Sequence, residues 1–111
     1  MTEEVLDAEN WKLEATAVIN DVKDHVKTLT ISEKLKSDNT HIYLNLITIE
    51  ENCYCIQLSG RGFRVVGYNF DEIDQATDEY FETPYSLLNK LSPKFKDSFA
   101  NDLFNRLNNL S

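Results

Sequence analysis

The sequence is poor in the residues that mark several common kinds of functional site. Its 111 residues include three glycines, two cysteines and two histidines, with no glycine-rich phosphate loop and no His-Glu-x-x-His motif. Cys53 and Cys55 are two residues apart, so in a strand they share a face and rarely meet disulfide geometry. His25 and His41 lack zinc-type spacing. We therefore expect reduced cysteines, no metal or other cofactor, and no catalytic activity.

Basic residues and long apolar runs are also scarce. Lys and Arg number 11 against 19 Asp and Glu, for a formal net charge of −8. This balance argues against binding to nucleic acid or to an anionic membrane surface, and it favours basic or mixed protein partners. No run approaches the ~18 apolar residues of a membrane span. Residues 1–4 lack the start of a signal peptide. We expect a cytosolic or nuclear protein.

What the chain does contain is typical of one small α+β domain. A hydrophobic content of 41% is enough for a core without a metal or a disulfide. Residues 1–10 are acidic and lack an apolar period, which predicts a mobile arm before a single domain over 11–111. Apolar residues recur at helical spacing over 12–29, and 28–35 suits a short strand or an extended connection.

The middle of the chain has the pattern of an antiparallel sheet. Three strand-like runs lie at 42–49, 53–58 and 63–68. Their short connections predict a meander of three or four strands. The acidic stretch 69–82 lacks the pattern of a calcium loop, so we expect a solvated acidic face. Thr83-Pro84 and Ser92-Pro93 each predict a helix start, which adds two C-terminal helices packed on the sheet to the N-terminal helix.

The last helix has a wider apolar arc than one buried face needs. Its apolar residues cover roughly 180° of a helical wheel, whereas packing on a core needs about 100°. The excess predicts either a helix wedged between the sheet and a second helix, or a helix that offers one side to a partner's groove. The apolar residues are Phe95, Phe99, Ala100, Leu103, Phe104, Leu107 and Leu110.

Several short stretches carry a resemblance to a known family. They are Val65-Val66-Gly67-Tyr68 with Phe70-Asp71, Tyr85-Ser86-Leu87-Leu88, Leu91-Ser92-Pro93, the first-helix residues 13–22, and Phe99, Asn101, Leu103, Arg106 and Leu107 near the end. In these stretches, from about Leu13 to Leu110, the chain resembles the glycogen synthase kinase-3 beta interaction protein family. The same domain also occurs in clustered-mitochondria proteins. The alternative is therefore an interaction domain excised from a protein of that type.

The resemblance implies a non-catalytic cytosolic protein that binds glycogen synthase kinase-3 and restrains or scaffolds it in Wnt and β-catenin signalling. The family's kinase-binding segment is the C-terminal helix, which also resembles the kinase-binding helix of axin. Carried over by position, the binding residues are Phe99, Leu103, Arg106, Leu107 and Leu110. The apolar members lie within roughly 80° on the wheel with the arginine at their border, which suits docking in a groove with the arginine paired to a carboxylate.

The family also anchors the regulatory subunit of cAMP-dependent protein kinase through the first helix. The corresponding positions here are Val18, Ile19, Val22 and Lys23. The vertebrate form continues this helix with Leu-Phe where this chain has Lys23-Asp24. Because burial of an unpaired lysine in an apolar groove is costly, we expect this anchoring to be weak or absent.

Overall fold

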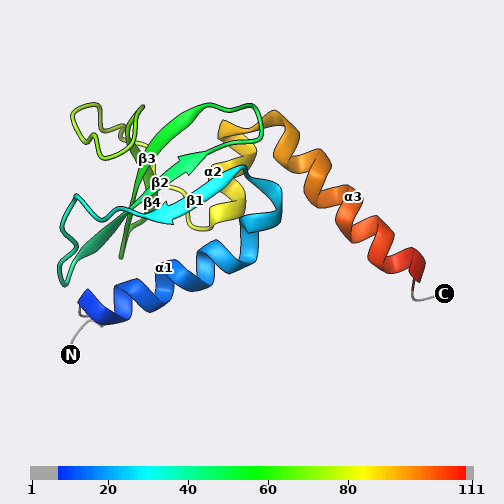
Figure 1. Cartoon of the computed structure of the whole chain (residues 1–111), viewed down its shortest axis with the longest axis horizontal. Helices are drawn as coiled ribbons and strands as arrows, with labels where there is room; N and C mark the ends of the chain where they lie inside the picture. Colours follow the sequence, from blue (N-terminus) through cyan, green and yellow to red (C-terminus); the bar gives the residue numbers. More distant parts are fainter. Residues whose placement is uncertain (1–7, 110–111) are drawn as a thin grey trace.

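The structure, a computed structural model, describes residues 8–109 as a four-stranded sheet with helices on one side. In chain order the elements are α1 (Ala8–Val22), the 3₁₀ turn η1 (Lys23–His25), β1 (Thr28–Ile31), β2 (His41–Ile47), β3 (Cys53–Ser59), β4 (Gly62–Gly67), α2 (Pro84–Leu91) and α3 (Pro93–Asn109). Neighbouring strands are antiparallel and follow the order β1-β2-β3-β4. The predicted α+β class and meander are confirmed. Figure 1 also shows α3 extending away from the rest of the domain.

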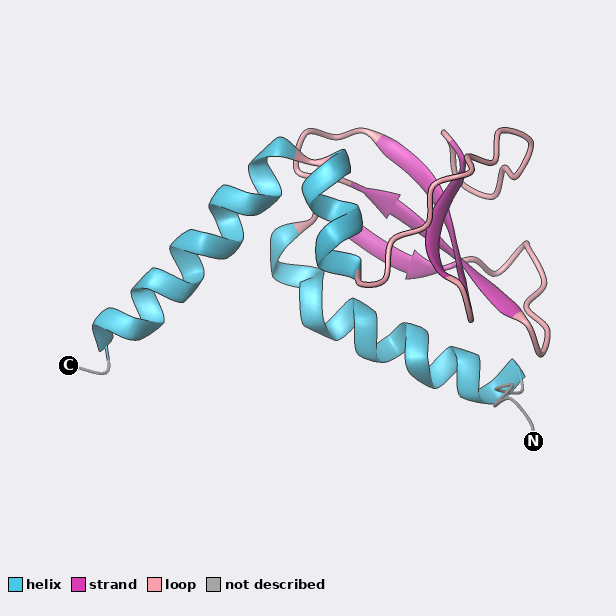
Figure 2. Cartoon of the chain, turned by 180° about the vertical axis from the view of Figure 1, so that it is seen from behind, coloured by secondary structure: helices cyan, strands magenta, loops and turns pink. Residues whose placement is uncertain are grey.

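Helix α1 buries the apolar stripe that its residue spacing predicts. Ala15, Val18 and Val22 of that stripe are buried, and Trp11, one turn before Ala15, extends the buried side. The indole N–H of Trp11 also donates to the backbone carbonyl of Asn39 at 3.0 Å. The same stripe therefore holds α1 against the sheet. Figure 2 shows from behind how α1 runs along one side of the sheet.

Both ends of α1 differ from the prediction. The helix begins at Ala8, so residues 8–10 are helical rather than part of a mobile arm, while residues 1–7 of that arm lie outside the described range. The α-helix ends at Val22 instead of near residue 29. The chain turns through η1, and Thr28 already pairs with Ile47 of β2. Residues 28–31 are rich in β-branched side chains, and their pairing with β2 stabilises a strand more than their apolar spacing favours a helix.

The core lies between one face of the sheet and the helices α1 and α2. Ile42, Leu44 and Leu46 alternate along β2 and are almost fully buried, as expected for a half-buried antiparallel strand. Leu88 of α2 packs in the same cluster, and so does Phe95 from the first turn of α3. The final helix thus joins the core only through its beginning.

The segment between β4 and α2 covers part of the opposite face of the sheet. The backbone N–H of Asp71 donates to the side chain of Asn45 at 2.9 Å. In return, Asn45 and Ser32 donate to the Asp71 carboxylate at 2.9 and 2.5 Å. These bonds, the one from Asn45 foremost, hold the pKa of Asp71 below its usual value. The expected solvated acidic face does exist, since Glu72, Asp74 and three further acidic residues of the stretch 69–82 are exposed. Asp71, however, attaches this stretch to the sheet.

Gly67 allows this segment to approach the end of β4. A Cβ atom built at Gly67 would overlap the backbone carbonyl oxygen of Glu72. The register also shifts here, because Cys55 pairs with Gly67 while Ile56 pairs with Val65. A bulge with a glycine at its end therefore lets the chain turn back over the sheet.

Candidate partner-binding helix

The first turn of α3 is fixed to the body of the domain. The Ser92 hydroxyl accepts a hydrogen bond from the N–H of Phe95 at 3.2 Å, which is the N-cap predicted from Ser92-Pro93. The carboxylate of Glu50, in the turn between β2 and β3, accepts from the Ser92 hydroxyl at 2.8 Å and from the N–H of Lys94 at 2.7 Å. Burial raises the pKa of Glu50, but these hydrogen bonds outweigh it and hold that pKa below its usual value.

The second turn of α3 packs against a buried histidine. His25 of η1 is 5% exposed, and its Nδ1 lies 2.9 Å from the Ser98 hydroxyl. Its ring packs edge-on against Phe95 and Phe99, with centroids 5.9 and 5.4 Å away. Tyr85 of α2 also contacts Phe99, at 5.5 Å between ring centroids. Both η1 and α2 therefore contact the second turn of α3.

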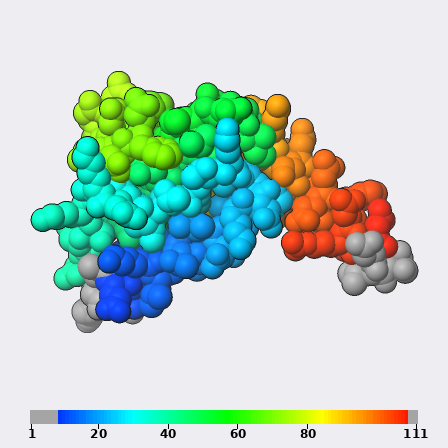
Figure 3. Space-filling model, in the orientation of Figure 1, coloured from blue at the N-terminus to red at the C-terminus, as the bar shows by residue number. Residues whose placement is uncertain are grey.

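Beyond this base, α3 leaves the domain with its apolar side chains uncovered. Phe99 is 39% exposed, and Leu103, Phe104 and Leu107 are 50%, 62% and 58% exposed. Figure 3 shows the corresponding end of the molecule, in orange to red, standing clear of the body. Of the two alternatives left open by the sequence, the wedged helix does not describe this part of α3. We call the exposed side chains of Phe99, Leu103, Phe104 and Leu107 the α3 stripe.

The structure brings most of the expected kinase-binding residues together. Phe99, Leu103 and Leu107 succeed one another at four-residue steps on one side of α3. Leu110 lies outside the described residues. The side chain of Arg106 is 72% exposed, and its guanidinium group lies 3.0 Å from the Asp102 carboxylate, one turn earlier. This intrahelical ion pair was not anticipated, although the four-residue spacing of opposite charges was a visible signal.

Phe104 belongs to the exposed surface but was missing from the expected binding residues. It is 62% exposed, the largest value in the α3 stripe. On the helical wheel it lies about 100° from Leu103, outside the compact arc, and three residues before Leu107. Its place in the apolar series of the last helix was the available signal. The exposed apolar surface is therefore wider than the arc expected from the family resemblance.

The expected anchoring residues lie in α1 and, for Lys23, at the start of η1, and they divide into two groups. Val18 and Val22 are 8% and 0% exposed and belong to the domain's own core. Ile19 is partly buried, while Lys23 is exposed. A partner helix on this side of α1 would therefore meet Ile19 and a lysine rather than a continuous apolar face.

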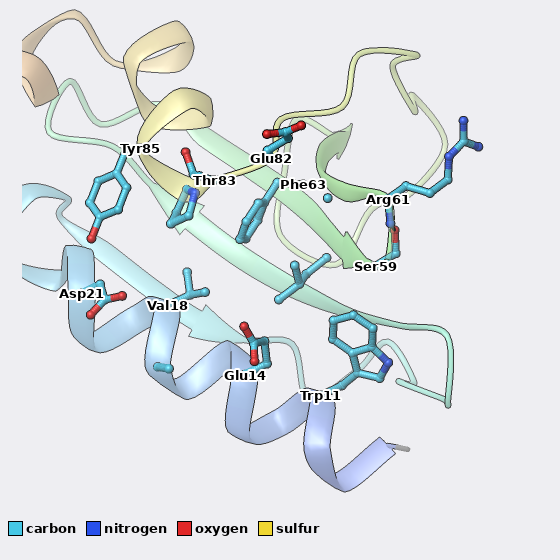
Figure 4. A pocket seen from close by; sticks show the side chains of 15 residues that line it. Trp11, Glu14, Val18, Asp21, Ser59, Arg61, Phe63, Glu82, Thr83 and Tyr85 are labelled. Atoms are coloured by element: carbon cyan, nitrogen blue, oxygen red, sulfur yellow. Dashed lines mark hydrogen bonds between the residues drawn. The ribbon is translucent and has the colours of Figure 1, made fainter. Parts of the chain in front are cut away.

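A second surface feature is an acidic groove between α1, the β3–β4 turn and the start of α2. It has a volume of about 580 Å³ and is drawn in Figure 4. Glu14 and Asp21 from α1 and Glu82 from beside α2 line it, together with Trp11 and Tyr85. No cysteine and no histidine is among the described residues that line this groove.

Both cysteines of the chain lie in β3. Cys53 and Cys55 are free. They lie on one face of β3, as their two-residue spacing predicts. Burial raises the pKa of Cys55 to about 11, so its thiol stays protonated at neutral pH. Within residues 8–109 there is no group of three His, Cys, Asp or Glu side chains that could hold a metal ion. No helix in this range is long and apolar enough to span a membrane.

Sheet, covering helices and projecting α3 together define a small α+β domain with an exposed helical surface. The GSKIP domain model matches residues 11–110, and the chain belongs to this family. It is 44% identical to the "GSK3B-interacting protein" of Bos taurus over 102 residues, which cover 91% of this chain and 73% of the relative. The human protein of the same name is 42% identical with the same coverage. The "Protein GSKIP homolog" of Drosophila melanogaster is 32% identical, covering 78% of this chain and 76% of the relative.

Proposed function

We propose that this chain is a non-catalytic protein that binds glycogen synthase kinase-3 through α3. The observation that carries the proposal is the α3 stripe, an apolar surface on a helix that projects from the domain. Removal of apolar surface from water contributes roughly 25 cal/mol per Å², so a groove on a partner that covers the stripe gains binding energy. The names of the bovine and human relatives support this kinase as the partner.

The domain supplies a rigid base for this docking. Glu50 and His25 hold the first two turns of α3, so little ordering of the helix base accompanies binding. The side chain of Arg106 lies beside the stripe and is available to a carboxylate of the kinase. Its present pair with Asp102 is exposed and, at about 0.3–0.5 kcal/mol, is readily exchanged for a better one.

In this proposal the bound kinase is restrained or scaffolded, with consequences for Wnt and β-catenin signalling, in the cytosol or the nucleus. One domain over residues 11–111 carries the activity, without a cofactor and without nucleic-acid or membrane binding. We propose no strong anchoring of the cAMP-dependent kinase regulatory subunit, since the exposed Lys23 of η1 directly follows the last residue of α1. The alternative, a domain excised from a clustered-mitochondria protein, predicts a different set of partners.

Purified full-length chain and purified glycogen synthase kinase-3 provide the test. We expect a complex with a 1:1 ratio by titration calorimetry, and competition by a peptide of axin's kinase-binding helix. Loss of phosphorylation of a β-catenin peptide in the complex would indicate restraint, and unchanged phosphorylation would indicate scaffolding. If no binding were detected at about 100 μM of either protein, the binding free energy would be weaker than about −5.5 kcal/mol, and the proposal would be contradicted. Recovery of mitochondrial-surface factors from a lysate in place of the kinase would favour the alternative.

A further inference from the structure

The fold covers one edge of the sheet and leaves the other open. Along β4, residues 75–81 run beside the strand, and Phe63 and Phe81 donate backbone hydrogen bonds to each other, both 2.8 Å long. At the opposite edge, β1 pairs with β2 alone, and within residues 8–109 no strand lies on its outer side. Figure 1 shows β1 at this open side of the sheet, next to α1. An edge of this kind is a template for a further strand.

The ladder fixes which backbone groups of β1 face outward. The N–H of Ser32 donates to the carbonyl of Tyr43 at 2.9 Å, so these two residues form a hydrogen-bonded pair. Such pairs alternate along antiparallel strands, which makes Thr30 the next β1 residue bonded to β2. Leu29 and Ile31 lie at the intervening positions, and their N–H and C=O groups point to the open edge.

A groove lies along this edge. It has a volume of about 790 Å³ and is lined by Ile19 of α1, by all four of the residues 29–32, and by Leu35 in the following loop. Ile19, Leu29 and Ile31 are partly buried, so each keeps some apolar surface in contact with water. The groove therefore combines an open backbone edge with an apolar wall, which are the two parts of a site for strand addition.

The charges around the groove differ from those of the whole chain. Lys12 and Lys36 line it together with a single acidic residue, Glu33, whereas the chain has 11 Lys and Arg against 19 Asp and Glu. In the part of the chain that the structure describes, neither lysine forms an ion pair. The edge thus carries positive charge that an acidic ligand can match.

We propose that β1 binds an extended acidic peptide from a partner protein by strand addition. The peptide backbone bonds to the outward N–H and C=O groups of Leu29 and Ile31. Every second peptide side chain is apolar and packs against Ile19 and Leu35, because side chains alternate between the faces of a strand. Acidic residues at the ends of the paired segment lie near Lys12 and Lys36. This surface is separate from α3, so it serves a second partner.

A displayed library of random twelve-residue peptides, selected on the full-length chain, tests the proposal. We expect enrichment of sequences with alternating apolar residues and flanking Asp or Glu. A selected peptide, added to saturation, should slow amide hydrogen exchange at Leu29 and Ile31 at least about tenfold and leave Thr30 nearly unchanged, since Thr30 is already bonded to β2. This alternation distinguishes strand addition from contact with side chains alone.

Charge reversal supplies the matched control. The double variant Lys12→Glu/Lys36→Glu should weaken the selected peptide about fivefold or more, whereas Lys90→Glu/Lys96→Glu, with the same change of net charge, should have little effect. Enrichment of basic or helical sequences, no enrichment, or equal protection of all three amides would overturn the proposal. So would a dimer of the free chain, detected by sedimentation, with Leu29 and Ile31 already protected. None of these results depends on kinase binding by α3.

Discussion

The carboxylate of Glu50 accepts a 2.7 Å hydrogen bond from the backbone N–H of Lys94, which joins the β2–β3 turn to the first turn of α3. One turn further on, Ser98 lies 2.9 Å from a ring nitrogen of His25. These contacts attach α3 to two separate elements at its base. The direction in which the helix leaves the domain is therefore set by the fold, and the α3 stripe is presented from a fixed support.

The close approach of Gly67 to the following segment predicts a position-specific cost for a methyl group. Gly67→Ala places its Cβ against the backbone carbonyl oxygen of Glu72, so one of the two backbone segments must shift. We expect a loss of about 1–3 kcal/mol in the free energy of unfolding, measured with urea. Gly60→Ala is the matched control, because nothing lies within 4 Å of its added methyl group. Equal stability of the two variants would contradict this packing.

The hydrogen bonds to Asp71 predict a loss of stability in acid. Its pKa is lowered in the folded state, so the ionised carboxylate stabilises the fold above the unfolded-state pKa of about 3.9. That contribution is lost as the pH falls through the folded-state pKa. In Asp71→Asn the urea midpoint should change less between about pH 5 and pH 2 than in the parent chain. Asp74→Asn, at an exposed position of the same segment, should retain the parent's pH dependence, and a flat parent profile would refute the account.

The exposed lysine at the end of α1 predicts poor anchoring of the cAMP-dependent kinase regulatory subunit. We expect the isolated docking domain of that subunit to bind the parent chain weakly or not at all in fluorescence anisotropy. Lys23→Leu should improve binding about tenfold, the equivalent of ~1.4 kcal/mol, because it removes the cost of burying an ammonium group. Lys90→Leu, which is on α2, controls for added surface hydrophobicity. Tight binding by the parent chain would show that the lysine does not interrupt the site.

Arg106 predicts a change in affinity without a matching change in fold stability. Arg106→Glu should reduce the affinity for glycogen synthase kinase-3 at least about tenfold, since an attractive pair becomes a repulsive one. The melting temperature should fall only slightly, because the exposed pair with Asp102 contributes about 0.3–0.5 kcal/mol. Arg106→Lys keeps the charge and should bind more tightly than Arg106→Glu. A large drop in melting temperature at unchanged affinity would place Arg106 in the fold and not in the interface.

Local patterns in the sequence were enough to predict most of the fold. The spacing of Ala15, Val18 and Val22 predicted α1, and the caps at Thr83 and Ser92 predicted where α2 and α3 begin. These features depend on neighbours within a few residues, which periodicity and capping describe well. The end of α1 was misjudged because pairing with a distant strand, and not local spacing, decides it.

The contacts that hold the candidate site in place could not be predicted from such local patterns. Asp71 contacts Asn45, Glu50 contacts Lys94 and His25 contacts Ser98 across 26, 44 and 73 residues of sequence. No periodic pattern encodes such contacts. The same long-range contacts decide whether the apolar side chains of α3 are buried or exposed. They hold only the first two turns of the helix against the domain.

The affinity of one double variant tests the central claim most directly. Leu103→Ala/Leu107→Ala removes two exposed side chains from the α3 stripe, and Leu13→Ala removes one of similar exposure, 64%, from α1. Binding to glycogen synthase kinase-3 is measured by calorimetry for the parent and both variants, alongside their melting temperatures. We predict that the double variant loses at least about a hundredfold in affinity, ~2.7 kcal/mol, while all three chains melt within a few degrees of one another and Leu13→Ala binds like the parent. Unchanged affinity of the double variant would show that α3 is not the kinase-binding surface.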